Sequence, residues 1–343
     1  MENEKGRIDI LKDEMLFALV EILEQDVKMT IKKEEILKML PKVYNDLSVE
    51  KIIKILPYDS YLALEEIIKY VKDNSNTEDV TKKIISFYDK KDKGVKYLID
   101  LMIVVLRVKK GKHTYYVDLE VLKALEKIYT DENRKKVEEY EKLEKIILGI
   151  LYTYGVVENK YFLKTISRCM GKIIPENEIL KFVFTRINLS KIVKYEYLEW
   201  ENNTVDEFIT YLSSNNTFDN GFEPTRNDVI NIAVEQKIRG LNYKKYTKDE
   251  YIAQAKSILG KREKDFLEYI NQYEIIPNFI FELILVKIKS AVDVNEWFMP
   301  ILEEMEKDKV SEFLDKYKKF YNNLPSYVLC GYSPNEYSKN IKN

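Results

Sequence analysis

Ten basic side chains lie between residues 81 and 113, and together they suit contact with the phosphates of a nucleic acid. Set against three aspartates, they give this segment a net charge of +7, whereas the whole chain of 343 residues carries −2. Lysine and arginine beside a phosphate backbone release its counterions, so such binding weakens steeply as salt rises. The candidate contact residues are Lys82, Lys83, Lys90, Lys91, Arg107, Lys109, Lys110 and Lys112.

A solvated, lysine-rich surface would have the same composition, and this alternative stays open. Lysine lacks the planar fork with which arginine donates two hydrogen bonds to one base edge. Arg107 is the one arginine in the segment. The pattern therefore favours contact with the backbone of DNA or RNA over recognition of a base sequence.

Residues that commonly carry catalysis are scarce in this chain. It has one histidine, His113, and two cysteines, Cys169 and Cys330, too few to complete a tetrahedral Cys/His zinc site. We expect His113 on a surface strand and Cys169 in a core, and we find no phosphate-binding, dinucleotide-binding or zinc-protease motif. The sequence predicts no catalytic residue, no cofactor and no metal, with a carboxylate-based hydrolase as a remote alternative.

The composition predicts a mainly α protein. Apolar residues make up 45% and charged residues 33% of the chain, with only 10 Gly and 8 Pro to form turns. The first 13 residues are charged throughout, and no apolar run reaches the 18 or so residues that a membrane span needs. We therefore expect a cytoplasmic protein with no membrane partner. The bias towards Ile, Lys, Asn and Tyr is typical of an AT-rich bacterial genome.

The basic segment falls where helices give way to a β-hairpin. An apolar run over 101–106 leads into alternating residues, a Lys110-Gly111-Lys112 turn and a β-rich return strand over 113–117. Helical patterns precede it at 59–70, from residue 81, and just before the hairpin. Three helices followed by a wing are the order of a winged-helix unit, predicted here over 57–130.

The same pattern recurs over 131–212. The charge-dense stretch 131–147 marks a boundary, helices are expected at 143–154, 160–170 and 176–187, and 191–200 alternates like a strand with a turn after it. The polar loop 213–227 marks the next boundary. We predict an N-terminal helical segment (1–56), tandem winged-helix-like units with short β-hairpins (57–130 and 131–212) and a C-terminal helical domain (222–343).

The segment near the C-terminus has the most distinctive sequence. Ser333-Pro334-Asn335-Glu336 predicts a capping box with a helix starting at Pro334. The preceding residues 322–332, here called the strap, are expected to be extended and to close the C-terminal domain. A peptide-binding role is the less favoured alternative. The candidate interaction residues are Tyr327, Leu329, Tyr332, Ser333 and Glu336.

This stretch, NNLPSYVLCGYSPNEY, resembles a segment of poorly characterised Firmicute helical proteins, some of which carry a SEC-C zinc motif after it. The resemblance covers about 16 residues and implies a helical family without an assigned activity. No Cys-x-Cys or Cys-His pair follows in this chain. Metal binding therefore does not carry over.

Two functional hypotheses of different kinds follow. In the first, the protein is a non-enzymatic cytosolic regulator that contacts nucleic acid through the basic helix-wing face. In the second, it is a protein-protein interaction adaptor that binds no nucleic acid. The adaptor hypothesis rests on the acidic residues Glu196, Glu199 and Glu201 in the second predicted strand region, which are unsuited to phosphate contact.

Overall fold

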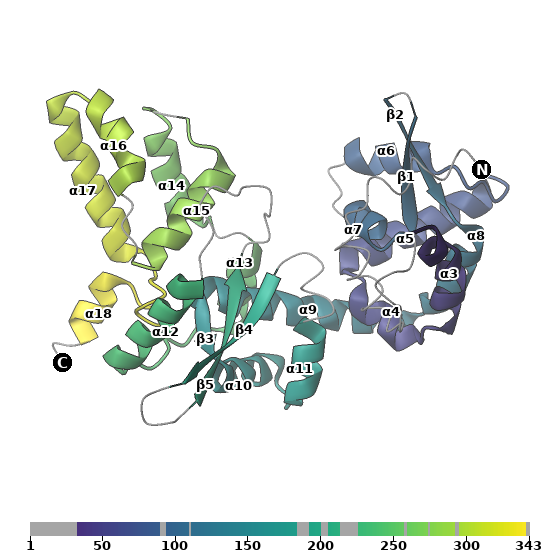
Figure 1. Cartoon of the computed structure of the whole chain (residues 1–343), viewed down its shortest axis with the longest axis horizontal. Helices are drawn as coiled ribbons and strands as arrows, with labels where there is room; N and C mark the ends of the chain where they lie inside the picture. The colour runs from purple at the N-terminus through teal and green to yellow at the C-terminus, as the bar shows by residue number, and fades with distance from the viewer. Residues whose placement is uncertain are drawn as a thin grey trace. The chain divides into compact units, whose positions relative to one another are not determined.

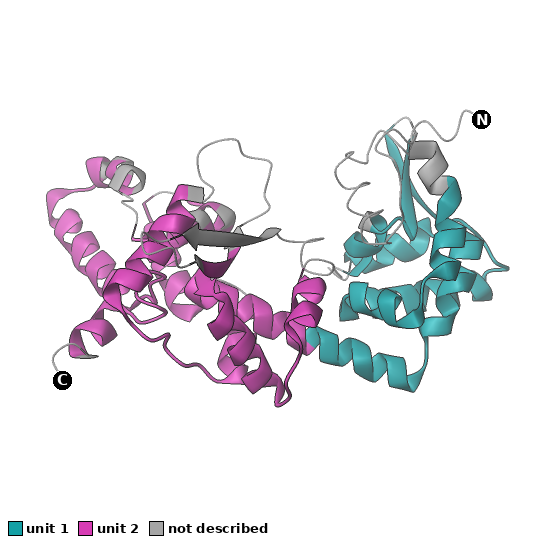
Figure 2. Cartoon of the chain, turned by 60° about the horizontal axis from the view of Figure 1, so that its bottom comes forward, with its two compact units in different colours: residues 1–141 teal, residues 142–343 magenta. Residues whose placement is uncertain are grey.

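The computed structural model describes residues 33–89, 94–109, 111–183, 192–199, 205–212, 226–256, 259–273, 275–291 and 295–340. The chain divides into two compact units, residues 1–141 and 142–343 (Figure 2). The division falls within helix α9 (Asp131–Tyr154), inside the charge-dense stretch where the sequence placed a boundary. The finer division into four segments stays a prediction.

The prediction of a mainly α fold is confirmed (Figure 1). In the described part of the chain, strands form one two-stranded and one three-stranded sheet. The elements of unit 1 are α3 (Lys33–Asp46), α4 (Val49–Ile55), α5 (Tyr58–Asp73), α6 (Thr81–Asp89), α7 (Gly94–Asp100), β1 (Val104–Lys109), β2 (Lys112–Val117), α8 (Leu119–Leu125), the short 3-10 helix η1 (Glu126–Ile128) and the first part of α9.

Unit 1 folds around the apolar face of α5. Tyr61, Leu64 and Ile67 are fully buried on this helix, at three-residue intervals that keep them near one helical face. The buried hydroxyl of Tyr44 donates to the carbonyl of Leu101 at 2.7 Å, which joins α3 to the start of the hairpin region. The Tyr61 hydroxyl likewise donates to the Ile128 carbonyl at 3.2 Å, so both tyrosines combine apolar burial with a satisfied hydroxyl group.

The predicted hairpin is present, and a third segment extends it. Strands β1 and β2 pair antiparallel, and Gly111 turns between them at φ +76°. The extended residues before α6 pair with β2 through the bridge Asp79–Tyr116 and through the bond from the Val80 amide to the Tyr115 carbonyl. From α5 to β2, unit 1 therefore consists of a helix, a short extended segment, two helices and a hairpin. The extended segment pairs with β2 on the side opposite to β1.

The first part of unit 2 repeats this order. After α9 come β3 (Val156–Glu158), α10 (Asn159–Met170), α11 (Glu176–Phe182), β4 (Ile192–Glu199) and β5 (Val205–Leu212). The sheet order is β3-β5-β4, antiparallel throughout, so the short strand after the first helix again pairs with the last strand. Gly171 ends α10 at φ +68°, the left-handed conformation that glycine commonly adopts at the end of a helix. The sequence did not predict β3.

The remainder of unit 2 is helical, as predicted. Its elements are α12 (Arg226–Arg239), α13 (Lys248–Lys256), α14 (Lys261–Ile270), α15 (Asn278–Lys289), α16 (Asn295–Glu304), α17 (Lys307–Asn323) and α18 (Pro334–Asn340). Helices α14 to α17 share one apolar core, in which the rings of Phe266 and Phe320 stack at 4.2 Å. A second core joins Val156 and Phe208 of the sheet to α12 and to the strap.

The strap is not extended, which corrects the prediction. Its later residues form a closed turn, in which the Ser326 amide donates to the Tyr332 carbonyl and the Gly331 amide donates to the Ser326 carbonyl, both at 3.0 Å. Cys330 (φ +51°) and Gly331 (φ +85°) both adopt left-handed backbone conformations that reverse the chain here. The sequence shows the glycine but gives no sign that a cysteine takes this conformation.

Candidate functional site

In unit 1 the start of α6 and the return strand of the hairpin form one edge, here called the α6-hairpin edge. The Thr81 hydroxyl accepts a hydrogen bond from the Tyr115 amide at 2.8 Å, which fixes α6 against β2. Lys82 and Lys112 are both exposed there, 30 residues apart in sequence. The Asp79 carboxylate accepts bonds from Thr81, which lower its pKa, and Lys112 and Lys82 lower that pKa further. Two of the predicted contact residues, Lys82 and Lys112, therefore belong to the same edge of unit 1.

Two other predicted contact residues already have partners within unit 1. Lys83 is 2.6 Å from the Glu66 carboxylate, and its ammonium also lies 4.8 Å from the centre of the Phe87 ring. The Arg107 guanidinium stacks over Tyr116, with 4.2 Å between its central carbon and the ring centroid. Both side chains are half-buried. They therefore offer less free charge than the sequence count suggests.

The remaining predicted residues are described only in part. Lys90, Lys91 and Lys110 lie outside the described residues, and Lys109 is described as the last residue of β1 without its side chain. Lys96 is exposed on α7, where the buried residues Val95 and Leu98 flank it. α7 packs so closely on α5 that a Cβ at Gly94 would lie 2.4 Å from the Asp59 carbonyl oxygen. This helix therefore offers little side-chain surface of its own.

His113 lies at the surface, whereas both cysteines are buried. His113 is exposed on β2, and Cys169 is buried on α10, so both interpretations are confirmed. Burial raises the pKa of the Cys169 thiol and raises that of Cys330 to about 12. Neither thiol is a ready nucleophile in the folded chain.

The strap residues are mostly interior. Tyr327 and Leu329 are buried against the sheet core, whereas Tyr332 is half-buried beside them. The capping box is present, since the Glu336 amide donates to the Ser333 hydroxyl at 3.3 Å and the Ser333 amide donates to the Glu336 carboxylate at 2.9 Å. The geometry therefore gives these five residues packing and capping roles.

Lys244 ties the capping box to the preceding segment of unit 2. Its ammonium lies 2.6 Å from the Glu336 carboxylate. Partial burial alone would raise the pKa of Glu336, but bonds from Lys244 and from the Ser333 amide hold it below its ordinary value. Glu336 thus serves the helix cap and an ion pair at once.

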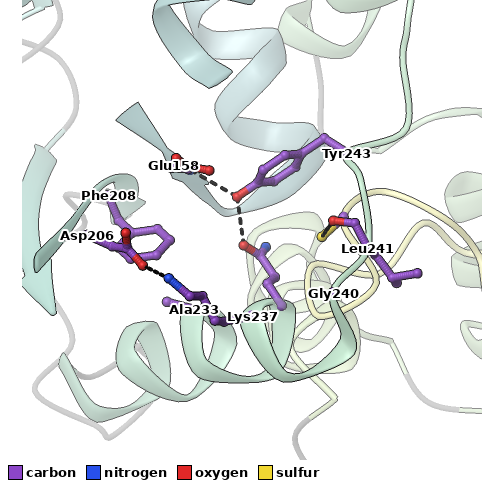
Figure 3. Close-up of a pocket in the computed structure, with 10 residues that line it drawn as sticks. Glu158, Asp206, Phe208, Ala233, Lys237, Gly240, Leu241 and Tyr243 are labelled. Carbon is purple, nitrogen blue, oxygen red and sulfur yellow. Dashed lines mark hydrogen bonds and ion pairs between the residues drawn. The ribbon is translucent and has the colours of Figure 1, made fainter. Parts of the chain in front are cut away.

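A cavity of about 310 Å³ lies between the sheet of unit 2, α12 and the strap (Figure 3). Asp206 and Lys237 form an ion pair at its border, and the Tyr243 hydroxyl accepts a bond from the Glu158 amide. Its volume is at the lower end for ligand pockets. Two carboxylates, those of Glu158 and Asp206, border it, and the second is already paired.

Both the nitrogen and the oxygen of the Gln236 side-chain amide form hydrogen bonds beside this cavity. Its nitrogen donates to the carbonyls of Val156 (3.0 Å) and Tyr327 (2.8 Å), and its oxygen accepts from the Tyr243 hydroxyl at 2.9 Å. Gln236 is itself buried. One side chain thus joins β3, the strap and the segment after α12, a structural role that the sequence did not reveal.

A cluster of tyrosines surrounds the end of α9. The Tyr154 hydroxyl lies 2.7 Å from that of Tyr251 and donates to the Lys244 carbonyl at 2.5 Å. The rings of Tyr161 and Tyr243 stack at 4.4 Å. Burial raises the pKa of Tyr154, so its hydroxyl stays protonated. The rings of Tyr243, Tyr246 and Tyr251 all contact that of Tyr154, which gives the three residues a packing role.

Among the described residues, no group of three His, Cys, Asp or Glu side chains has a geometry suited to a metal ion. No helix of the described ranges combines the length and apolar character needed to cross a bilayer. Comparison with protein-family models, with curated proteins and with solved structures finds no match to this chain, so the resemblance of the strap segment to Firmicute helical proteins stays a prediction.

Proposed function

We propose that the protein is a non-enzymatic regulator that contacts the backbone of a nucleic acid through the α6-hairpin edge. The observation that carries this proposal is that the Thr81–Tyr115 hydrogen bond and the Asp79–Tyr116 bridge join the start of α6 to β2, so that the exposed residues Lys82 and Lys112 belong to one edge. Both ammonium groups are exposed, and neither forms an ion pair with another described residue. Exposed lysines without partners can neutralise phosphates without first breaking an ion pair.

The order of elements supports a winged-helix reading of both units. A helix, a short extended segment, two helices and a hairpin follow one another in unit 1 and again in unit 2. In both, the short segment pairs with the second strand of the hairpin. Winged-helix units are a form of helix-turn-helix domain, which commonly binds DNA. Function still has to be argued from the site, because folds host many functions.

The residue types favour backbone contact with little sequence preference. The helix just before the hairpin of unit 1, α7, exposes Lys96 between buried neighbours, and its surface is too small to read several base pairs. Arg107 stacks on Tyr116, which leaves a guanidinium edge that suits one phosphate. We infer binding that depends strongly on salt and weakly on base sequence.

The test is a titration of the full chain with a short fluorescent duplex at several salt concentrations between about 50 and 200 mM. The variant Lys82→Gln/Lys112→Gln removes the two exposed charges. If each lysine contacts one phosphate, the variant has a negative slope of log K against log salt that is smaller in magnitude by about 1.8 than that of the parent chain. The matched control, Lys42→Gln/Lys123→Gln, removes two exposed charges from α3 and α8, outside this edge. A slope equal in both variants would refute the proposal.

The second candidate function is the protein-binding adaptor, and exposed apolar side chains on α6 favour it. Ile85 is 49% exposed and Tyr88 46% exposed, on the helix that begins at the α6-hairpin edge. The acidic residues that motivated this hypothesis, Glu196, Glu199 and Glu201, have no described side chains. A substitution Ile85→Lys that improves duplex binding while abolishing capture of a stoichiometric protein would favour the adaptor.

A further inference from the structure

Unit 2 carries a row of basic side chains that sequence reasoning did not single out. Lys160, Lys164 and Arg168 follow one another at four-residue intervals on α10, and all three are exposed. Four residues advance a helix by about 6 Å and little more than one turn, so the three side chains lie along one face. Phe162 and Ile166 are fully buried on the same helix. The basic row is therefore the solvent face of a firmly packed helix.

A second segment brings two more lysines beside the end of this row. The Arg168 guanidinium donates to the Tyr246 carbonyl at 3.2 Å, and Lys245 and Lys248 stand exposed on either side of Tyr246 in sequence. Burial raises the pKa of the Cys169 thiol, whereas Arg168 and Lys248 both act to lower it. Two segments about 80 residues apart thus form one α10 basic surface. Its members are Lys160, Lys164, Arg168, Lys245 and Lys248.

None of these five cations forms an ion pair with another described residue. Elsewhere in unit 2 the pattern differs, since Lys237 pairs with Asp206 and Lys244 pairs with Glu336. Of the two acids that follow Lys248, the second, Glu250, accepts bonds from Thr247 and so caps α13. An incoming polyanion would therefore meet charges that form no ion pair with a carboxylate of the described residues.

We propose that the α10 basic surface is a second contact surface for the phosphate backbone of a duplex nucleic acid. This inference rests on the proposed function for one point, namely that the ligand is a nucleic acid. The three residues follow one another about every 6 Å along the axis of α10, so their long side chains can reach separate phosphates of one strand, which carries a charge every 3.4 Å along the duplex axis. α10 also holds the position in unit 2 that α6 holds in unit 1.

The experiment compares three forms of the full chain in the same duplex titration. One carries Lys164→Gln/Arg168→Gln/Lys248→Gln, one carries Lys82→Gln/Lys112→Gln, and the control carries Lys261→Gln/Lys264→Gln/Lys318→Gln. The control removes three exposed charges from α14 and α17 of the same unit. If each α10-surface cation contacts a phosphate, the first variant lowers the salt slope by about 2.7 relative to the control.

The outcomes separate the two proposals. A reduced slope in the first variant alone supports the α10 surface and overturns the α6-hairpin edge, whereas a reduced slope in the Lys82/Lys112 variant alone does the reverse. Reductions in both support a ligand that contacts both surfaces. No binding by the parent chain overturns both. Displacement of the duplex by poly-L-glutamate at equal charge would overturn the assignment to nucleic acid, because an acidic protein would then serve equally well.

Discussion

The ring of Tyr327 packs directly against the backbone of Gly155. A Cβ built on Gly155 would lie 2.5 Å from Cδ2 of that ring, far inside normal contact distance. Gly155 also has φ +68°, a backbone conformation that residues other than glycine rarely adopt. The end of α9 and the strap, 172 residues apart, thus meet at a point where only glycine fits.

Gly155→Ala should lower the free energy of unfolding by clearly more than the 1 to 2 kcal/mol expected for a left-handed alanine, because the methyl group also displaces Tyr327. Gly171→Ala is the matched control, since Gly171 has the same φ of +68° and nothing within 4 Å of a built Cβ. Urea unfolding of both variants measures the difference. Equal losses would mean that the Tyr327 contact adds nothing.

Ser333→Ala should cost about 1 kcal/mol of unfolding free energy, because the Glu336 amide at the start of α18 loses its side-chain acceptor. Ser338→Ala is a suitable control, since its hydroxyl donates to the Asn335 carbonyl within the same helix and caps nothing. Chemical denaturation reports both values. A smaller loss at Ser333 than at Ser338 would contradict the capping role.

A chain that ends at Tyr321 should melt at a markedly lower temperature than the full chain. It lacks Leu324, Tyr327 and Leu329, all buried, and each fully buried side chain of this size contributes roughly 1.5 to 3 kcal/mol. Differential scanning calorimetry measures the shift. An unchanged melting temperature would show that the strap is a binding segment and not a structural one.

Lys289 should make stability depend on pH. Burial lowers the pKa of its ammonium from 10.5 to about 8, against the opposing effect of Glu263. Between these values the folded chain releases the proton while the unfolded chain keeps it, so stability rises with pH. From about pH 7 to 9.5 this gain reaches roughly 2 kcal/mol.

The comparison chain for this effect is Lys289→Met, which keeps an unbranched apolar stem and removes the titrating group. Its backbone carbonyl still accepts from the Tyr327 amide and the Ser326 hydroxyl. Unfolding at several pH values should show the rise for the parent chain alone. Parallel curves for the two chains would mean that Lys289 keeps an ordinary pKa.

Tyr154→Phe should destabilise the chain by roughly 1 to 3 kcal/mol, because the Tyr251 hydroxyl and the Lys244 carbonyl both lose a hydrogen-bond partner. Tyr70→Phe removes the hydroxyl of a half-buried tyrosine on α5, a group that forms no hydrogen bond with any described residue. Thermal unfolding compares the two. A loss no larger for Tyr154 would argue against an organising role for the tyrosine cluster.

Local signals in the sequence predicted most of the helices and the first hairpin. Gly111 indicated the turn of the hairpin, because glycine readily adopts the left-handed backbone conformation found there, and Pro334 indicated the start of α18, because proline fixes φ at a helical value. β3 was missed, since three residues show no periodicity and become a strand only by pairing with β5. The short segment at Asp79 was missed for the same reason.

The candidate sites were harder to predict, because charge along the sequence does not show which charges are free. Lys83 counted towards the basic segment, yet the fold pairs it with Glu66. The i,i+4 spacing of Lys164 and Arg168 was visible, but not that Lys248 would lie beside them. Burial and long-range pairing decide these relationships, and neither can be read from one stretch of sequence.

Because Gly155 and Tyr327 are so distant in the chain, unit 2 completes its core late in synthesis. Until residues 326–333 emerge from the ribosome, Val156 and Phe208 of the sheet lack the strap side chains that pack in the same core in the finished fold, while α12 covers them in part. An incomplete nascent chain therefore displays an apolar sheet face, a known source of aggregation and of chaperone binding. Translation arrested before the strap would leave a product that the cell must protect or degrade.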